Sequence, residues 1–511
     1  MDNSSAIRGF VVIVSAIALA LWLGVSIVTN QSETLLYSAG GGMLLICAFL
    51  GRKIWLLLVF FSALSFPLMR GFGTSEVGQA LFIGFSLVMF LMRRLPMKIK
   101  FGELECWMLL IAACVLQIYL RNPVGLNIFS AGSVGARPYF IVTLAFVTGT
   151  VLGNIIVPPG EIKWAMRLSI IGTFLGMFLT TVRMRGGGGE IAMDRRSKLE
   201  DAGSSGRIGF LGSLSYSISR IIASYISPLK ALLHPFWMPV ILATVAAAAG
   251  SGYRNNVAAV GLIYLIAIAY RGGFAAVFLS CITGAMGIGL LALVNLAVPL
   301  PPNVQRALSP FPGTWEARYV EAAEGSTDWR IEMWKEALFT DYWIHNKIFG
   351  DGLGFTRQEY ELMQSLEDGG RGLETSGSGM SAQQEAMMIT GGYHSGPVQC
   401  VRIIGYAGLA VTLMAMIRFA VHAHRLILRC RGTEWYPLAL YTGIPVISLP
   451  FMYTFVFGDF TRDVSAIFFA YGMLSLLRKN LPLPAYVKPR REPYILQRQK
   501  PTQARAHRIP G

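Results

Sequence analysis

Runs of about twenty apolar residues recur along nearly the whole chain, and they constrain its fold more than any motif does. A helix of roughly 20 residues crosses the ~30 Å hydrocarbon core of a bilayer, where only helices or closed barrels satisfy every backbone group. A barrel would show short alternating strands instead of continuous apolar runs. With 54% hydrophobic and 14% charged residues and a mean hydropathy of +0.52, the composition departs from that of a water-soluble protein. The sequence therefore predicts an all-α polytopic membrane protein.

The placement of basic residues predicts the orientation of the spans. Lys and Arg concentrate in residues 92–100, in residues 418–431 and in the tail after Arg478, and such clusters stay in the cytoplasm. Both chain ends then lie inside and the number of crossings is even, so residues 208–226 should cross too, for a total of about 12–14. Arg220 in that segment costs ~2.5–3.5 kcal/mol at mid-depth and must face the bundle interior or snorkel. The other predicted spans are residues 9–28, 34–50, 54–69, 77–92, 103–120, 138–157, 164–181, 235–249, 256–270, 274–299, 403–420, 436–457 and 464–477.

This orientation divides the chain into five parts. Residues 1–182 hold the N-terminal transmembrane helices, which begin with an expected uncleaved signal anchor, and residues 183–300 combine an outer Gly- and Arg-containing loop with the central spans. Residues 301–402 form a large outer loop domain, residues 403–478 the C-terminal spans, and residues 479–511 a basic cytoplasmic tail. The net charge is +16, and the tail carries prolines and lacks helical periodicity. A basic tail of this composition predicts attraction to anionic membrane lipids rather than binding of nucleic acid.

Several arginines lie beside the outer ends of spans, where the inside-positive rule gives no reason for them. Arg254 in GSGYRNN begins one span, Arg207 in SSGRIGF begins another, and Arg330 lies in the outer loop. A guanidinium stays charged and presents a planar set of donors, which suits a pyrophosphate. His394 in GGYHSGP precedes a further span, so its imidazole is expected at the water–membrane boundary, where it can titrate near neutrality. The plainer interpretation is that the arginines anchor helix ends among lipid headgroups and the histidine occupies a surface turn.

The outer loop carries further patterns. Asp328 is placed to cap a helix whose apolar face includes Ile331 and Trp334 and leaves Arg330 on another face. The segment FGDGLGF is similar to a phosphate-binding loop only in its glycines, because no strand precedes it and no Walker lysine follows it. A tight turn is therefore expected there. The tryptophans of the loop are expected to be packing anchors rather than sugar ligands.

The sequence gives no reason to expect a metal ion or another cofactor. Arginines can compensate the charge of a pyrophosphate, and no Asp-x-Asp pair stands at an outer helix end. Asp459 and Asp463 flank Arg462 and are expected to pair with it locally.

The motifs follow one another in a definite order. The chain shows GRIGFLGS, a span, GSGYRNN, two spans, DWRIEMWKEAL and FGDGLGF in the long loop, and then YHSGP with IIGYAGL at the start of a further span. This order resembles the O-antigen ligase and polymerase superfamily. That family has a small-residue–arginine motif at the start of one helix and, two helices later, a long periplasmic loop that ends in a histidine motif. The resemblance covers residues 183–477, and Ser395 departs from it because the family usually has asparagine there.

The resemblance implies a GT-C-like glycosyltransferase of the bacterial cytoplasmic (inner) membrane with its active site facing the periplasm. Such an enzyme moves a glycan from an undecaprenyl-pyrophosphate carrier to an acceptor hydroxyl in cell-surface polysaccharide biosynthesis. His394 would act as general base toward that hydroxyl, a role that typically supplies ~10²–10⁴-fold. Arg254, Arg207 and Arg330 would neutralise the departing pyrophosphate. The acceptor is left open among lipid A core, a growing polysaccharide and a protein.

Two other classes of protein share some of these features. A transporter or flippase of lipid-linked oligosaccharides also needs many spans and cationic surfaces. Transport sites sit near the bilayer midplane at broken helices, often with internal repeats, whereas here the charges collect at the outer boundary and no repeat is visible. A scaffold for polysaccharide export would leave His394 without a role. We therefore favour the enzyme.

Overall fold

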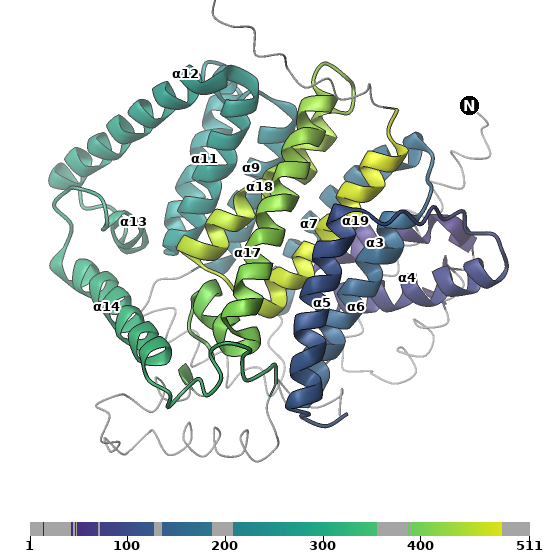
Figure 1. Cartoon of the computed structure of the whole chain (residues 1–511). Helices are drawn as coiled ribbons and strands as arrows, with labels where there is room; N and C mark the ends of the chain where they lie inside the picture. Colours follow the sequence, from purple (N-terminus) through teal and green to yellow (C-terminus); the bar gives the residue numbers. More distant parts are fainter. Residues whose placement is uncertain are drawn as a thin grey trace, which may run out of the picture.

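In the computed structural model the described part of the chain is an almost entirely helical bundle (Figure 1). The structure describes residues 49–69, 72–126, 135–185, 208–354 and 391–482, together with residues 387 and 388 and a few single positions before residue 49. Strands β1 (Pro67–Met69) and β2 (Phe72–Gly73) pair antiparallel in a short hairpin. The helices are η1 (Gly51–Lys53), α3 (Ile54–Leu64), α4 (Thr74–Leu91), α5 (Glu103–Arg121), α6 (Arg137–Asn154), α7 (Pro159–Arg185), α9 (Gly209–Tyr225), α10 (Pro228–Leu232), α11 (Trp237–Gly250), α12 (Arg254–Ala297), α13 (Pro302–Leu308), α14 (Ala317–Phe339), α17 (Gly396–Cys430), α18 (Tyr436–Phe451), the π-helix η2 (Met452–Val456) and α19 (Phe460–Asn480).

Seven helices within the described residues are long and apolar enough to cross a membrane, namely α4, α5, α7, α12, α17, α18 continued by η2, and α19. Helices α3, α6, α9 and α11 lie where spans are predicted but are shorter or less apolar. The two spans predicted in residues 256–299 are the arms of α12, which bends at Gly273, where φ is 76°. The predicted signal anchor and the basic tail after residue 482 lie outside the described residues. The fold is thus that of an all-α, multi-pass membrane protein.

Glycines allow the closest helix contacts in the bundle. On α6, a Cβ at Gly149 would collide with the Phe468 carbonyl of α19, and Gly153 lies one turn further along the same contact. On α7, Gly172 and Gly176 face the backbone of α3 in the same way. Apolar side chains gain little by moving from lipid to protein, so membrane helices associate where small residues let backbones approach. These two pairs, each spaced four residues apart, fix α6 against α19 and α7 against α3.

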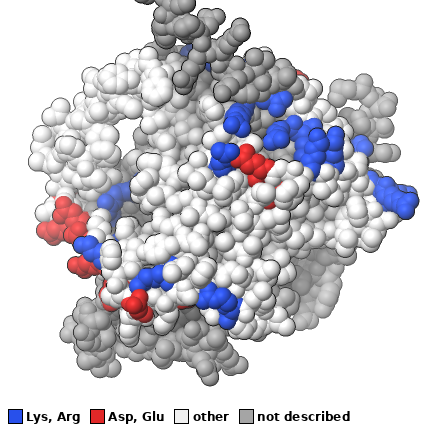
Figure 2. All heavy atoms as spheres, viewed as in Figure 1, with Lys and Arg blue, Asp and Glu red and all other residues white. Residues whose placement is uncertain are grey.

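Helix α17 joins the two ends of the bundle. His394 lies just before its first residue, whereas Arg425 and Arg429 lie in its last two turns. The arm of α17 from its bend at Gly405 to Cys430 alone extends roughly 35–40 Å at 1.5 Å per residue. The histidine and this basic segment therefore lie at opposite ends of the bundle. Figure 2 shows most charged side chains of one face towards its upper right and lower parts, with uncharged surface between them.

Residues 345–354, which include the predicted tight turn at FGDGLGF, form a turn in the predicted outer loop, hereafter the outer turn, and it completes a bend in α17. The bend lies at Gly405, where φ is 73° and the helical hydrogen bonds are interrupted. The N–H of Tyr406 donates to the Lys347 carbonyl at 2.8 Å, and the Arg402 carbonyl accepts from the N–H of Asp351 at 2.7 Å. All three glycines of the turn have positive φ, so it curves sharply enough to reach both sides of the bend. The turn therefore provides hydrogen-bond partners for backbone groups of α17 that the bend leaves without helical partners.

Candidate functional site

The two small-residue–arginine motifs meet at one end of the bundle. The N–H of Ile208, just before α9, donates to the Ser251 carbonyl at 2.9 Å. Gly212, one turn into α9, packs so closely on Asn256 that a Cβ there would collide with the asparagine amide. Arg254 is the first residue of α12 and is half-buried in this junction. Arg207 lies outside the described residues, directly before Ile208.

The histidine motif is held rigidly at the start of α17. His394 has a φ of 51°, a left-handed conformation that costs a non-glycine residue ~1–3 kcal/mol and needs support from its surroundings. Tyr393 before it is fully buried, and its carbonyl accepts a 2.7 Å hydrogen bond from the indole of Trp334 on α14. Burial raises the pKa of Tyr393 to about 12, so its hydroxyl remains a neutral donor to the Met388 carbonyl at 3.2 Å. The expected packing role is confirmed for Trp334.

The break between α18 and α19 places a third segment beside the histidine motif. The hydroxyl of Tyr453 in η2 donates to the Gly396 carbonyl at 2.8 Å, and a Cβ at Gly396 would lie 2.6 Å from the Tyr453 ring. The N–H of Phe460 donates to the side chain of Gln399 on α17 at 2.7 Å. Phe457, which lies between η2 and α19, has its ring 5.8 Å from the His394 imidazole. The glycine after the histidine thus lets η2 approach the start of α17.

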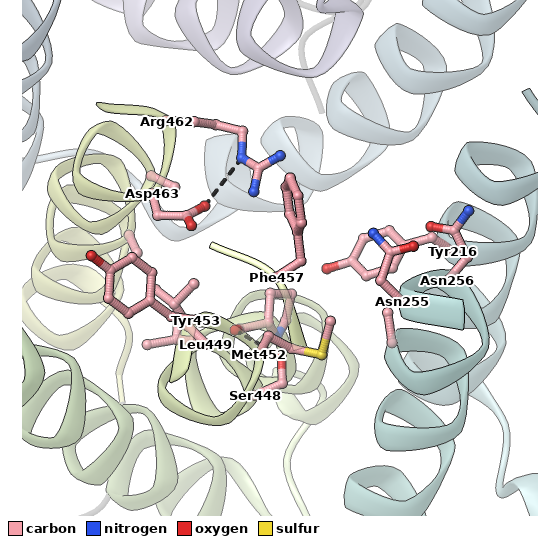
Figure 3. Close-up of a pocket in the computed structure, with 15 residues that line it drawn as sticks. Tyr216, Asn255, Asn256, Ser448, Leu449, Met452, Tyr453, Phe457, Arg462 and Asp463 are labelled. Carbon is pink, nitrogen blue, oxygen red and sulfur yellow. Dashed lines mark hydrogen bonds and ion pairs between the residues drawn. The ribbon is translucent and has the colours of Figure 1, made fainter. Parts of the chain in front are cut away.

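A cavity of about 460 Å³ lies between α9, α12, α18, η2 and α19. Tyr216 and the asparagines of GSGYRNN lie on one side of it and Phe457 on the other (Figure 3). His394 and Arg254 do not line this cavity: the His394 ring centre lies 5.8 Å from that of Phe457, which does, and Arg254 directly precedes the lining residue Asn255. The lining residues with polar side chains are Tyr216, Asn255, Asn256, Ser448, Tyr453, Arg462 and Asp463.

The ion pair expected at the start of the last helix is confirmed, and it lines this cavity. Arg462 Nε lies 3.1 Å from Asp463 Oδ1, and the Arg462 N–H donates to Asp459 Oδ1 at 2.8 Å. The guanidinium carbon of Arg462 lies 5.4 Å from the centre of the Phe457 ring. The sequence analysis treated these residues as a local pair only. These residues lie at the start of the last helix, on the same side of the predicted membrane as the histidine motif. That position was the signal that could have placed them in the site.

Arg330 lies on α14, but the structure corrects the predicted helix. The helix begins at Ala317, so Asp328 is an exposed interior residue and not its cap. Ile331 is exposed, whereas Arg330 is half-buried on the face of Trp334, one turn away. Arg330 therefore lies on the face of α14 that packs against the histidine motif. Of the predicted apolar face, Trp334, Ala337 and Leu338 pack inward, and only Ile331 does not.

A further arginine supports the histidine motif from within α17. Arg402 lies two turns after His394, and its side chain packs under Gly391, where a Cβ would be 2.7 Å from Arg402 Cδ. Gly391 has a φ of 72°, so this position requires glycine both for its conformation and for this contact. No local sequence pattern predicts this role of Arg402, because it depends on a loop that folds back over the helix.

Arg220 faces the bundle interior, as expected for a charged residue in a membrane helix. Its Nε donates to the Tyr441 carbonyl of α18 at 2.9 Å, and its guanidinium carbon lies 3.8 Å from the centre of the Tyr441 ring. Tyr216, one turn earlier on α9, lines the cavity. The arginine therefore joins α9 to α18 directly behind the cavity wall.

No model of a known protein family matches this sequence, and no curated protein matches it either. The class that fold and site define is a multi-pass helical membrane protein with a cavity, lined by apolar and polar side chains, towards one end. The function must be argued from the residues around that cavity.

Proposed function

We propose that this protein is a glycosyltransferase of the O-antigen ligase and polymerase type. It would reside in the bacterial inner membrane and move a glycan from an undecaprenyl-pyrophosphate carrier to an acceptor hydroxyl at the periplasmic face. The observation that carries the proposal is that His394 and Arg254 each lie beside a residue that lines one cavity, Phe457 and Asn255 respectively. The two residues come from motifs about 140 positions apart in sequence, and helices α9, α12, α17 and α19 bring them to the same end of the bundle.

The proposed orientation follows from α17. The basic end of this helix carries Arg425 and Arg429, and the inside-positive rule assigns such an end to the cytoplasm. The cavity lies at the other end and would face the periplasm, where lipid-linked glycans are presented to their acceptors. The apolar helices between the two ends support a bilayer-spanning arrangement.

The chemistry requires one base and a set of cations. The acceptor hydroxyl gives its proton to the imidazole of His394, and its oxygen attacks the anomeric carbon of the donor sugar. The bond from that carbon to the pyrophosphate oxygen breaks, and the lipid pyrophosphate leaves with the bonding electrons. Arg254, with Arg207 and Arg330, offsets the charge on the leaving group, and each charge-assisted hydrogen bond contributes ~1.5–3 kcal/mol. Among the described residues no cluster of three His, Cys, Asp or Glu is placed to hold a metal ion.

The test is release of polyprenyl pyrophosphate from a lipid-linked oligosaccharide by the purified protein in chelator. The wild-type protein is compared with His394→Ala across lipid-core, polysaccharide and peptide acceptors. His345→Ala is the matched control, because this imidazole belongs to the outer turn and its side chain is 81% exposed. We expect acceptor-dependent release that is lost in His394→Ala and kept in His345→Ala. Equal release by all three proteins would remove the histidine from the mechanism.

A transporter of lipid-linked oligosaccharide is the second candidate, and one feature favours it. Helix α18 contains Pro445 and Pro450 and continues into a π-helix, and Arg220 lies beside this break. Broken helices near the midplane are typical of transport sites. A transporter predicts movement of the labelled lipid between leaflets of liposomes without release of pyrophosphate for any acceptor. That outcome would replace the transferase with the transporter.

A further inference from the structure

We propose that the cavity beside the histidine binds an uncharged sugar ring of the donor or the acceptor, and that Tyr216 and Asn255 select it. This inference rests on the proposed function, since it names what the site holds next to the reacting bond. In the proposed function Arg254, Arg207 and Arg330 hold the pyrophosphate, and the cavity would hold the neutral ring. The two tasks are thereby assigned to different residues.

The charge of the cavity lining is balanced. Among its lining residues, Arg462 and Asp463 carry charge, and they form an ion pair with 3.1 Å between Nε and Oδ1. The Asp463 side chain is 10% exposed, so its carboxylate depends on this partner and offsets its charge. Arg220 and Arg254 are not among the lining residues. A pyrophosphate or a uronic acid needs a surplus of positive charge, which this lining does not offer, whereas a neutral ring needs none.

Tyr216 and Asn255 supply hydrogen-bonding groups that the protein itself does not use. Within the described part of the chain neither side chain has a hydrogen-bond partner, whereas Ser448 donates to the Pro445 carbonyl at 3.0 Å. Figure 3 shows both groups on the same side of the cavity, opposite Phe457. Polar groups in such enclosed positions normally find partners. A phenol and an amide each donate and accept, as a sugar hydroxyl does.

The remaining wall suits the apolar face of a sugar. Phe457 presents an aromatic ring, and Leu449 and Met452 extend the apolar surface beside it. The volume of about 460 Å³ falls within the range of small-ligand sites, roughly 300–1,000 Å³. The His394 ring centre lies 5.8 Å from the centre of the Phe457 ring, so a sugar that contacts Phe457 would lie near the proposed base.

The test combines equilibrium binding with kinetics on the full-length protein. Binding of a neutral oligosaccharide, of an oligosaccharide of the same length containing uronic acids, and of inorganic pyrophosphate is measured by calorimetry. The variants are Tyr216→Phe, which removes only the hydroxyl, and Asn255→Ala. Tyr225→Phe is the matched control, because this tyrosine lies on the same helix with its hydroxyl 3.5 Å from the Met166 sulfur, away from the cavity.

We expect wild-type protein to bind the neutral oligosaccharide more tightly than the acidic one. Each of the two cavity variants should weaken neutral binding roughly two- to ten-fold, the effect of one lost hydrogen bond, and leave pyrophosphate binding unchanged. In the transfer assay, a rise in KM for the acceptor alone identifies the acceptor ring, and a rise for the donor alone identifies the donor ring. Neutral binding that is unchanged in both variants, or pyrophosphate binding that falls equally, would overturn the inference. Neutral binding that depends on Tyr216 in a protein that never releases polyprenyl pyrophosphate would refute the transferase and keep the sugar site.

Discussion

Replacing Arg220 by methionine tests how the break in α18 is stabilised. Pro445 has no N–H, so the Tyr441 carbonyl one turn earlier lacks its helical donor. Arg220 of α9 donates Nε to this carbonyl at 2.9 Å and so takes the place of the missing group. We therefore predict that Arg220→Met destabilises the natural chain more than it destabilises a Pro445→Ala protein, where the alanine restores the helical N–H.

A double-mutant cycle isolates this hydrogen bond from the other effects of the substitution. Loss of the contact with the Tyr441 ring, 3.8 Å from the guanidinium carbon, occurs in both backgrounds. Relief of the cost of a charge at mid-depth, ~2.5–3.5 kcal/mol, also occurs in both. Hydrogen bonds to charged groups contribute ~1.5–3 kcal/mol, and interhelical ones in membranes average ~0.6 with a maximum near 1.7. A coupling energy of about 1–2 kcal/mol between Arg220 and Pro445 is expected.

The measurement is the free energy of unfolding of the four purified proteins in mixed micelles, obtained by titration with a denaturing detergent. The control cycle pairs Arg220→Met with Pro450→Ala, because Pro450 frees the Val446 carbonyl and not that of Tyr441. The control cycle should be additive within ~0.5 kcal/mol. If the Arg220–Pro445 cycle is additive as well, the arginine does not replace the missing donor and our account of the break is wrong.

Three further predictions concern Arg254 and two residues, Gly405 and Trp334, that stabilise the segments around the histidine motif. Arg254→Ala should abolish release of polyprenyl pyrophosphate by a normally inserted protein, and Arg254→Lys should restore little because the planar fork is lost; full activity of Arg254→Ala would end its assignment to the pyrophosphate. Gly405→Ala should lower the free energy of unfolding by at least ~1–2 kcal/mol, because φ is 73° and a Cβ would collide with the outer turn; an unchanged melting temperature would contradict this. Trp334→Phe removes the 2.7 Å hydrogen bond to the Tyr393 carbonyl and should speed amide exchange in residues 391–395, with unaltered exchange as the contrary result.

The helices could be predicted from the sequence, whereas the cavity could not. Long apolar runs mark membrane helices locally, so α5, α17 and α19 lie where they are expected. The start of α14 was misplaced because residues 317–324 are rich in Ala and Glu, whose helix propensity carries the helix past the expected cap at Asp328. Tyr216 and Arg462 were not predicted as site residues. Their role arises only when α9 and α19 pack around the same space, and nothing in their local sequence reports that packing.

Two helices are broken near the site, and the partners of their free backbone groups explain how such breaks persist in an apolar bundle. The bend of α17 at Gly405 and the break of α18 at Pro445 both leave backbone groups without helical partners. Such groups are costly in lipid and must be satisfied by protein. The outer turn satisfies those of α17, and Arg220 satisfies the Tyr441 carbonyl of α18. Since these partners come from other segments, the backbone groups at both breaks are satisfied within the protein and need no lipid or water partner.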